Sequence, residues 1–539
     1  MLPSPSSKLH DQLIAQIEEG RIKIPQFQRK FVWSVEESAA LLDSIIKGYP
    51  IGTFIFWDTQ ERLRSVRNIG DIELPETPDG RYVQYVLDGQ QRITSLYVSY
   101  KGAKVLGDDG KLVDYGEVYV DLTASEEDQV IIVDVSGRDA DSVVRFDRLM
   151  NDPFAVAQEH PDHASKLDEY RKAFLAYPYS VIIMEDASID VATEVFTRIN
   201  VGGKALSNFE IMAARVYDDG KGFDLAEKCD ELLERLEQVD YETISRTTIL
   251  QTISVCMTKS CTKKQILRLD KNQFISVWDD AASAIESAVE YFKQAYKIPV
   301  SRLLPYNALI VPFAYYFYNH PETPLGEHQV WLQDYFWRVV INSRFSSALE
   351  SKIGQDILRF DSMLSGQKPA NDELVDISVQ ALDERGSFRT SNAFIKGMLC
   401  ILAARQPRSL KDGALVNISN NWLKQANSKN YHHFFPKAFL KKQGIDAWRA
   451  NHIGNITIVD DFLNKRMIRD KAPSAYTEEF ARMNPNLTAD LETHLIGDLE
   501  EFGILGDDYE EFLKQRLQRF QEELIARLVL TEGDRVERG

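Results

Sequence analysis

Two adjacent histidines, His432 and His433, have the side chains best suited to chemistry, and the asparagines Asn455 and Asn464 follow them. A neutral imidazole accepts a proton from water near pH 7, because the ordinary pKa of histidine lies close to that value. A divalent metal ion accepts nitrogen and oxygen ligands, and two protein ligands suffice when phosphate oxygens and waters fill the other positions. These residues therefore suit the hydrolysis of a phosphodiester bond, in which a base activates water and a metal stabilises the leaving oxygen.

Short elements are expected to position these four side chains. Residues 431–435 predict one strand, and the alternating residues 455–459 predict a second. Adjacent residues of a strand point to opposite sides unless the strand bends or bulges. A helix is expected to follow, capped by Asp460 or Asp461 and with Asn464 in its first turns. The predicted order is strand, loop, strand and helix around one metal ion.

In this order, His432, His433, Asn455 and Asn464 resemble the HNH, or ββα-metal, nuclease motif. The pattern HHxFP, followed by NxxGN and a later asparagine, is similar to the C-terminal nuclease domain of GmrSD-type modification-dependent (type IV) restriction enzymes. By that resemblance His433 is the general base, His432 and Asn464 hold the metal, and Asn455 braces the loop of the active site. Many relatives carry an acidic residue in place of His432, and a neutral nitrogen ligand shifts metal preference from Mg²⁺ towards Mn²⁺, Ni²⁺ or Zn²⁺.

A second candidate site follows an apolar strand predicted over residues 83–87, and it consists of Asp88, Gly89, Gln90, Gln91 and Arg92. Gly89 permits a tight turn, and the helix that begins after it presents N–H groups to an anion. Arg92 adds a guanidinium that can bind phosphate with two hydrogen bonds. The alternative is a purely structural turn, since Asp-Gly turns before helices are common.

Gln28 and Arg29 are candidates to complete this second site from elsewhere in the fold, and a surface turn after Pro25 is the alternative interpretation. The sequence contains neither a Walker A motif nor GxGxxG, so a nucleotide site must be of another type.

The run from Asp88 to Arg92 resembles the DGQQR motif of the GmrSD N-terminal domain, which is similar to the ParB/sulfiredoxin-type fold. Residues 24–33, 196–207 and 344–356 resemble further segments of that family, so the resemblance extends over most of the chain. It implies that a nucleoside triphosphate, ATP or GTP, is bound or hydrolysed at the DGQQR site and that this is coupled to DNA cleavage.

The net charge of −19 over 539 residues argues against a uniformly basic surface, so DNA would need a local basic patch. Residues 429–471 offer one, although chance clustering in a long sequence is the alternative. This stretch contains four aspartates and nine cations. The cations are Lys429, Lys437, Lys441, Lys442, Arg449, Lys465, Arg466, Arg469 and Lys471. We expect His452, within this stretch, to be an exposed loop residue.

We expect a helix-rich, multidomain α+β protein of the cytoplasm, since the N-terminus lacks an apolar signal-peptide core and the most apolar run is too short and proline-rich to span a membrane. Residues 1–215 should form a ParB/sulfiredoxin-like α/β domain, with strands over 51–57, 82–87, 116–122 and 179–184. Residues 216–387 should form a helical linker domain, with aromatic stripes in its core and a polar linker or loop over 361–387. Residues 388–539 should form the HNH domain and C-terminal helices.

The resulting hypothesis is a nucleotide-regulated, metal-dependent DNA endonuclease of bacterial anti-phage defence, which cleaves modified DNA. A homodimer is expected, because a double-strand break needs two cuts and one chain carries one such site. One alternative is a nucleotide-responsive DNA-binding regulator or toxin-like protein with an inactive HNH unit. A nuclease that acts on RNA is a third, for which the sequence has no specific signature.

Overall fold

The structure is a computed structural model, and it shows a mixed α/β protein of which about half is helical. It describes residues 4–25, 28, 31–60, 63, 65–67, 69, 72–78, 80–106, 111–125, 128–199, 207–218, 220–370, 373–420, 423, 431–459 and 468–537. The chain divides into two compact units, Met1–Gly222 and Phe223–Gly539. The predicted helical domain, residues 216–387, lies almost entirely in the second unit, and the predicted nuclease domain, residues 388–539, lies within it.

The first unit contains strands β1 (Ser4–Lys8), β2 (Ile22–Pro25), β3 (Phe54–Thr59), β4 (Ser65–Arg67), β5 (Val83–Asp88), β6 (Lys104–Leu106), β7 (Leu112–Asp114), β8 (Tyr119–Asp121), β9 (Ile131–Ile132), β10 (Val143–Arg145) and β11 (Tyr179–Glu185). Six of them form a mixed sheet in the order β1-β11-β3-β5-β2-β4. β5 is parallel to β2 and antiparallel to β3. The four strands predicted from the sequence correspond to β3, β5, β8 and β11, with shifted ends.

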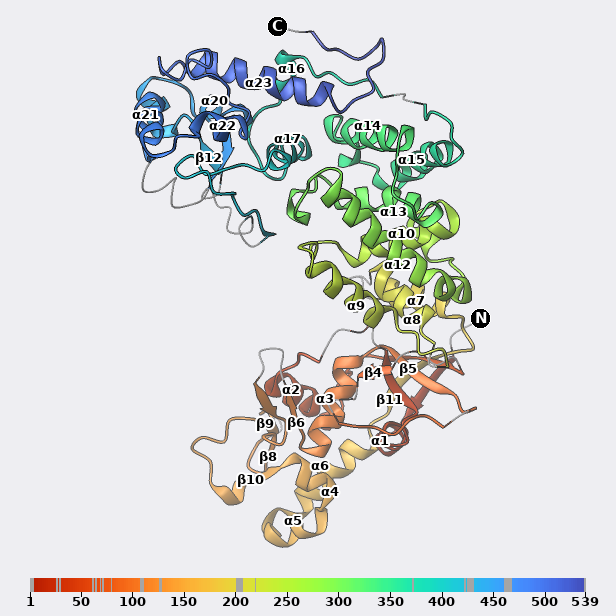
Figure 1. Cartoon of the computed structure of the whole chain (residues 1–539). Helices are drawn as coiled ribbons and strands as arrows, with labels where there is room; N and C mark the ends of the chain where they lie inside the picture. Colours follow the sequence, from red (N-terminus) through yellow and green to blue (C-terminus); the bar gives the residue numbers. More distant parts are fainter. Residues whose placement is uncertain are drawn as a thin grey trace. The chain divides into compact units, whose positions relative to one another are not determined.

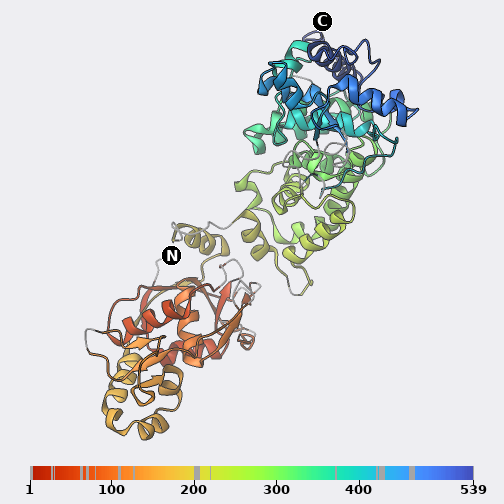
Figure 2. The same cartoon turned by 90° about the vertical axis from the view of Figure 1, so that its left-hand side faces the viewer.

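The helices of this unit are α1 (His10–Glu18), α2 (Val35–Ile46), α3 (Gln90–Lys101), α4 (Phe146–Asn151), α5 (Pro153–Glu159), α6 (Ala164–Ala176), α7 (Ile189–Ile199) and α8 (Asn208–Val216). α2 begins at a capping box in which Ser34 accepts from the Glu37 amide and the Glu37 carboxylate accepts from the Ser34 amide. α2 and α3 pack together against the sheet (Figure 1). Figure 2 shows α4, α5 and α6, coloured orange to yellow, grouped at one end of the unit.

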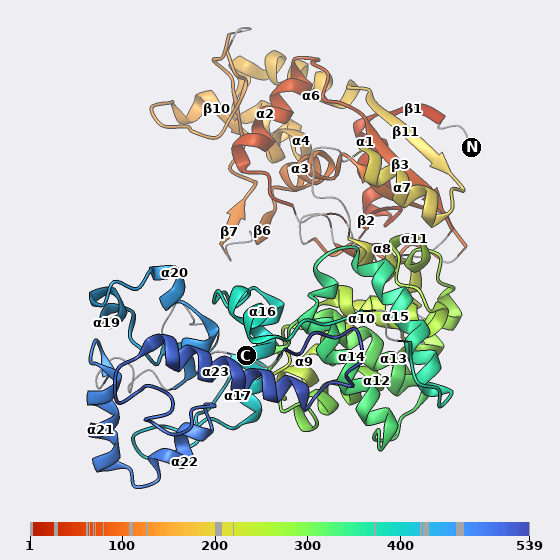
Figure 3. The same cartoon turned by 90° about the horizontal axis from the view of Figure 1, so that it is seen from above.

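The second unit contains α9 (Leu225–Glu237), α10 (Arg246–Thr258), α11 (Lys263–Ile266), α12 (Lys271–Gln294), η3 (Ser301–Leu303), η4 (Asn307–Leu309), α13 (Ile310–Asn319), α14 (Glu327–Ile341), η5 (Arg344–Ser346), α15 (Leu349–Leu364), α16 (Val379–Glu384), α17 (Ala393–Ala404), β12 (Tyr431–His433), α19 (Lys437–Lys442), α20 (Ala447–Ala450), η6 (Ile453–Asn455), β13 (Ile456–Ile458), α21 (Pro473–Met483), α22 (Leu487–Glu492) and α23 (Tyr509–Ile525). The predicted aromatic stripe of α12 is confirmed as core, because Phe274, Trp278 and Phe292 are buried. α23 packs beside α16 and α17 (Figure 3).

The prediction of a polar linker or loop over residues 361–387 is correct only in part, because the described residues between 365 and 378 lie outside helices and strands but the segment also contains helices and buried residues. α15 extends to Leu364, α16 lies inside the segment, and Val375 and Ile377 are buried. The C-terminal tail explains this burial, because the Ile377 amide donates to the carbonyl of Arg535 and the Arg535 amide donates to the carbonyl of Val375. Composition alone does not reveal a partner so distant in the sequence.

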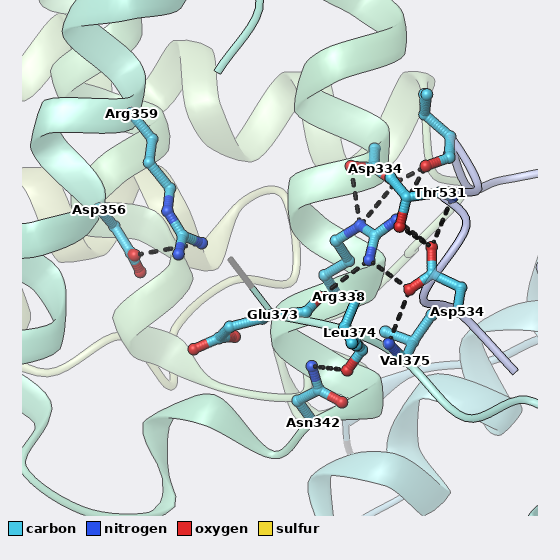
Figure 4. Close-up of polar contacts among 11 residues, drawn as sticks. Asp334, Arg338, Asn342, Asp356, Arg359, Glu373, Leu374, Val375, Thr531 and Asp534 are labelled. Atoms are coloured by element: carbon cyan, nitrogen blue, oxygen red, sulfur yellow. Dashed lines mark hydrogen bonds and ion pairs between the residues drawn. The ribbon is translucent and has the colours of Figure 1, made fainter. Parts of the chain in front are cut away.

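A buried charge network joins the C-terminal tail to α14 (Figure 4). The guanidinium of Arg338 donates to both oxygens of Asp334 at 3.0 Å and to the two oxygens of Asp534 at 3.0 and 2.8 Å. Its remaining hydrogen bonds reach the carbonyls of Glu373 and Val529. Every N–H of this arginine therefore has an acceptor, as a buried cation requires.

Among the residues described, no helix combines the length and the apolarity that a membrane crossing needs.

Candidate active site

Two paired strands hold the histidines. β12 pairs antiparallel with β13, so that His432 lies opposite Thr457 and His433 opposite Ile456. The predicted strands are therefore present, although each has only three residues. The predicted helix that would carry Asn464 falls on residues 460–467, which lie outside the described residues.

His432 is fully buried, and its surroundings indicate which ring nitrogen carries the proton. The Thr457 hydroxyl donates to the backbone carbonyl of His432 at 3.3 Å and lies 3.1 Å from Nδ1 of the ring. Because this hydroxyl uses its hydrogen on the carbonyl, it accepts from Nδ1–H. Nε2 then holds a lone pair, and this buried atom has no hydrogen-bond partner among the described residues. Burial lowers the pKa of His432 to about 3, so the ring is neutral near pH 7.

His433 is oriented by Asn451, the first asparagine of the NxxGN pattern, to which the sequence analysis gave no role. Nε2 of His433 lies 3.0 Å from Oδ1 of Asn451. The amide nitrogen of Asn451 donates to the carbonyl of Phe388 at 3.1 Å, which leaves Oδ1 as the acceptor for Nε2–H. Nδ1 of His433 is therefore the basic nitrogen. Burial and then the charge of Lys437 lower the pKa of His433 to about 4, while the bond to Asn451 opposes this shift.

Asn455 is completely buried and holds two backbone segments together. Its Oδ1 accepts from the Phe435 amide at 2.8 Å, and its Nδ2 donates to the carbonyls of Phe435 and Ala450, both at 3.0 Å. These bonds fix the turn after β12 relative to η6. The side-chain amide of Asn455 therefore contacts the backbone and not a ligand. Asn455 thus sets the position of the histidine strand from behind.

A cavity of about 270 Å³ opens beside the histidines. Its lining includes Tyr431, His432, His433, Pro436, Lys437, Ala438 and Arg469. Of the lining residues that the structure describes, Lys437 and Arg469 are cations and none is acidic. Burial lowers the pKa of Lys437. Such a cavity favours an anion beside two neutral imidazoles.

The predicted basic patch is only partly available to a ligand. Lys442 pairs with Asp470 at 2.8 Å, Lys471 pairs with Glu479, and Arg449 pairs with Asp383 and Glu510. Lys429, Lys465 and Arg466 lie outside the described residues. Lys437 and Arg469 are therefore the members of the patch whose position at the cavity is observed.

Of the two residues predicted to hold a metal, the structure describes one, His432. Nε2 of His432 offers a lone pair to a cation, and its Nδ1–H is held by Thr457, as in many metal-ligating histidines. Its proposed companion Asn464 lies outside the described residues. Within the described ranges, no group of three or more His, Cys, Asp or Glu residues is arranged to hold a metal ion.

His452 is not an exposed loop residue, so that expectation is wrong. It is 1% exposed, its Nδ1 accepts from the Gly454 amide at 3.0 Å, and its Nε2 lies 2.9 Å from the carbonyl of Asp383. Arg516 supports the same turn from α23, by donating to the carbonyls of Gly454 at 3.2 Å and Ile456 at 2.9 Å. The site is therefore backed by the C-terminal helix, which local sequence pattern does not indicate.

The turn from Asp88 to Arg92 has the predicted strand–turn–helix form. β5 ends at Asp88, Gly89 adopts a φ of +91°, and α3 begins at Gln90 without a side-chain cap. A side chain at Gly89 would place Cβ 2.5 Å from a ring carbon of Phe54, so glycine is required there. The start of α3 thus has no side-chain cap, and its use as an anion site stays a prediction.

Arg92 contacts protein oxygens in this structure. It donates to the carbonyl of Ile51 at 2.7 Å, to that of Thr53 at 3.1 Å and to the Asp88 carboxylate at 3.1 Å. These contacts hold the segment that leads into β3 against the start of α3. The arrangement braces the turn and occupies both terminal nitrogens of the guanidinium.

The glutamines of the candidate nucleotide site also have structural contacts. Gln28 is buried and donates to the carbonyls of Val86 at 2.9 Å and Leu87 at 3.0 Å, which brings it to the end of β5. Oε1 of Gln91 accepts from the Val32 amide at 2.9 Å, and Gln91 lies beside Gln90. Arg29 lies outside the described residues.

Two candidate sites were predicted from the sequence. One lies in a small ββ unit and contains the histidine pair, and the other lies at a glycine turn beside the six-stranded sheet. Residues 11–217 match the family model described as the N-terminal domain of the GmrSD restriction endonuclease. The first compact unit is therefore similar to that domain.

An uncharacterized protein of Methanocaldococcus jannaschii is similar to the chain along most of its length. The two are 22% identical over 529 residues, which cover 88% of this chain and 87% of the relative. The similarity thus includes both compact units.

Proposed function

We propose that this chain is a metal-dependent DNA endonuclease of the GmrSD type whose cutting site is the histidine cavity. The observation that carries the proposal is the pair of complementary imidazoles on β12. His433 is held through Nε2 by Asn451 and keeps Nδ1 as a base, and His432 is held through Nδ1 by Thr457 and keeps Nε2 as a ligand atom. One strand therefore supplies both a proton acceptor and a metal ligand.

In this proposal, Nδ1 of His433 takes the proton from the attacking water, and Asn451 keeps the ring in the required tautomer. Nε2 of His432, with Asn464, holds a divalent ion: Mg²⁺ or Mn²⁺, or Ni²⁺ or Zn²⁺. Such an ion supplies charge stabilisation for the leaving oxygen. Lys437 and Arg469 bind the phosphate, and Asn455 keeps the strand in place.

We further propose that the first unit binds ATP or GTP at residues 88–92 and that this binding controls cleavage. The N-terminus of α3, which has no side-chain cap, supports this part of the proposal. Modified phage DNA is the proposed substrate, as in a system of anti-phage defence, and a homodimer would deliver the two cuts of a double-strand break.

The test is cleavage of modified and unmodified phage DNA by the purified full chain, with each metal and with or without ATP or GTP. His433→Ala should abolish metal-dependent strand breaks while the fold is retained. His163→Ala, which alters a half-buried histidine of the first unit, is the matched control. Cleavage by the His433→Ala protein at the wild-type rate would overturn the assignment.

A second candidate function is a nucleotide-responsive DNA-binding regulator with an inactive HNH unit. It is favoured by Lys437 and Arg469 in the lining of the histidine cavity, because two cations oppose the binding of a metal cation there. Titration of DNA with the protein across several metals separates the two. Binding without strand breaks under every condition would favour the regulator.

A further inference from the structure

A second cationic cavity lies beside the histidine strand within the second unit. It has a volume of about 230 Å³ and lies among η3, η4, the N-terminal half of α17 and Tyr431 of β12. Among the described residues of its lining, Arg302 and Lys396 are the charged ones, and none is an aspartate or glutamate. The cavity therefore carries positive charge without an acidic wall.

Neither cation is neutralised in the part of the chain that the structure describes. Nε of Arg302 is buried without a hydrogen-bond partner, and no carboxylate forms an ion pair with this guanidinium. Nζ of Lys396 has only a long contact of 3.2 Å to the carbonyl of Leu304. Burial lowers the pKa of Lys396, and the charge of Arg302 adds to that effect. An anion between the two would relieve both the desolvation and the repulsion.

The loop that carries Arg302 is fixed before any ligand arrives. The Arg302 amide donates to Oδ1 of Asn420 at 3.1 Å, and Nδ2 of the same asparagine donates to the Ser301 hydroxyl at 3.1 Å. The Thr243 hydroxyl donates to that of Ser301 at 2.7 Å, and Asn307 donates to the Thr243 carbonyl at 2.8 Å. Hydroxyl and amide groups thus surround the two cations in a set geometry, which lowers the entropic cost of binding.

Tyr431 connects this cavity to the histidine cavity, because it lines both. Next to it in β12 are His432 and then His433. A nucleic-acid strand that places one phosphate at the histidines has further phosphates close by along the strand. The cation pair and the histidines thus line two cavities that share one residue, Tyr431.

We propose that Arg302 and Lys396 form a phosphate-binding pocket that receives a backbone phosphate of the DNA next to the one at the histidine cavity. The DNA source rests on the proposed function, whereas the phosphate chemistry rests on the cation pair alone. The phosphate of a free nucleotide has the same chemistry and is the other possible source, which the experiment distinguishes.

The experiment measures binding and does not depend on cleavage. In a His433→Ala background, the affinity for a dye-labelled DNA duplex is measured by fluorescence anisotropy over a series of KCl concentrations. Arg302→Gln with Lys396→Gln should weaken binding at least tenfold and lower the slope of log affinity against log salt by about 1 to 2. Lys264→Gln, an exposed lysine of α11, is the matched control and should change neither.

Charge-retaining variants and free phosphate complete the design. Arg302→Lys with Lys396→Arg should keep most of the affinity, which separates lost charge from a lost fold, and unfolding midpoints are recorded for each variant. Calorimetric titration with inorganic phosphate and with ATP tests the other source. Phosphate or ATP binding that the double Gln variant loses, with DNA affinity unchanged, would overturn the DNA source and retain the phosphate pocket.

Unchanged DNA affinity, salt slope and phosphate binding in the double Gln variant would overturn the pocket itself. A failure of the wild-type protein to cut DNA would instead count against the proposed nuclease, and the binding measurements would be unaffected by it.

Discussion

Nε2 of His433 lies 3.0 Å from Oδ1 of Asn451, and this contact selects Nδ1 of the histidine as the nitrogen that can accept a proton. The asparagine is itself fixed by its bond to the carbonyl of Phe388. Base and orienting group thus form a chain anchored in the backbone, which is the arrangement expected of a general base with a set tautomer.

Asn451→Ala should lower the rate of DNA cleavage by about 100-fold, because a positioned proton acceptor contributes roughly that much or more to such reactions. DNA affinity should change little, since Asn451 lies behind the histidine. Asn451→Asp retains an acceptor for Nε2–H and should recover part of the rate. Single-turnover cleavage rates check this, with Asn319→Ala, an exposed residue at the end of α13, as the control. A wild-type rate in Asn451→Ala would remove this residue from the mechanism.

Arg92→Ala should destabilise the first unit by roughly 2–3 kcal/mol, because the carbonyls of Ile51 and Thr53 lose a charged donor. Gly52→Ala should weaken the same contact, since its φ is +88° and a Cβ there would lie 2.4 Å from Nη1 of Arg92. Thermal unfolding measures both effects.

Arg198→Ala is the control for the Arg92 experiment, because its exposed side chain pairs with Glu194 on the same helix. Nucleotide affinity should be measured on the same proteins. An Arg92→Ala protein with an unchanged melting temperature and no nucleotide binding would show that Arg92 serves the ligand and not the fold.

Acid should destabilise the first unit through His10. This ring is buried against Tyr100, Phe174 and Tyr179, and neither nitrogen has a hydrogen-bond partner in the described residues. Burial lowers its pKa from 6.5 to about 4. Between these values the unfolded chain binds the proton and the folded unit does not, so stability is full above pH 6.5 and falls as the pH drops towards 4.

The change attributable to His10 between pH 7 and pH 5 is roughly 2 kcal/mol, from 1.4 kcal/mol for each unit of pKa. Hydrogen exchange of the β11 amides at the two pH values measures it. His10→Leu should reduce the pH dependence by that amount, whereas His163→Gln, a half-buried histidine of the same unit, should not. An unchanged pH dependence in His10→Leu would exclude this residue as the cause.

Asp534→Asn should destabilise the second unit by about 3 kcal/mol or more, because it leaves the buried guanidinium of Arg338 with one carboxylate and disturbs the tail that carries Asp534 (Figure 4). Urea unfolding measures the loss. Glu478→Gln breaks the exposed pair with Arg482 and should cost less than about 1 kcal/mol. Equal effects of the two substitutions would mean that the buried network contributes little.

Local elements of this protein follow from local pattern. The stripe of α12, the buried strand β5 and its turn at Gly89 were all predictable, because hydrophobic periodicity and turn residues act over a few residues. The burial within 361–387 was not, because it depends on a tail more than 150 residues away. Polar composition indicates a loop only when no distant strand or tail covers it.

The sequence alone supplied the candidate residues for chemistry and their order: a histidine pair with its asparagines, and a glycine turn between a strand and a helix. The tertiary structure decided what those side chains contact. In it, Asn451 contacts His433 and Thr457 contacts His432. The guanidinium of Arg92 donates to the backbone that leads into β3, and Arg302 and Lys396 line a cavity with Tyr431. The physical reason is that hydrogen-bond partners and desolvation are set by packing between segments far apart in the chain, which residue types and short spacings do not encode.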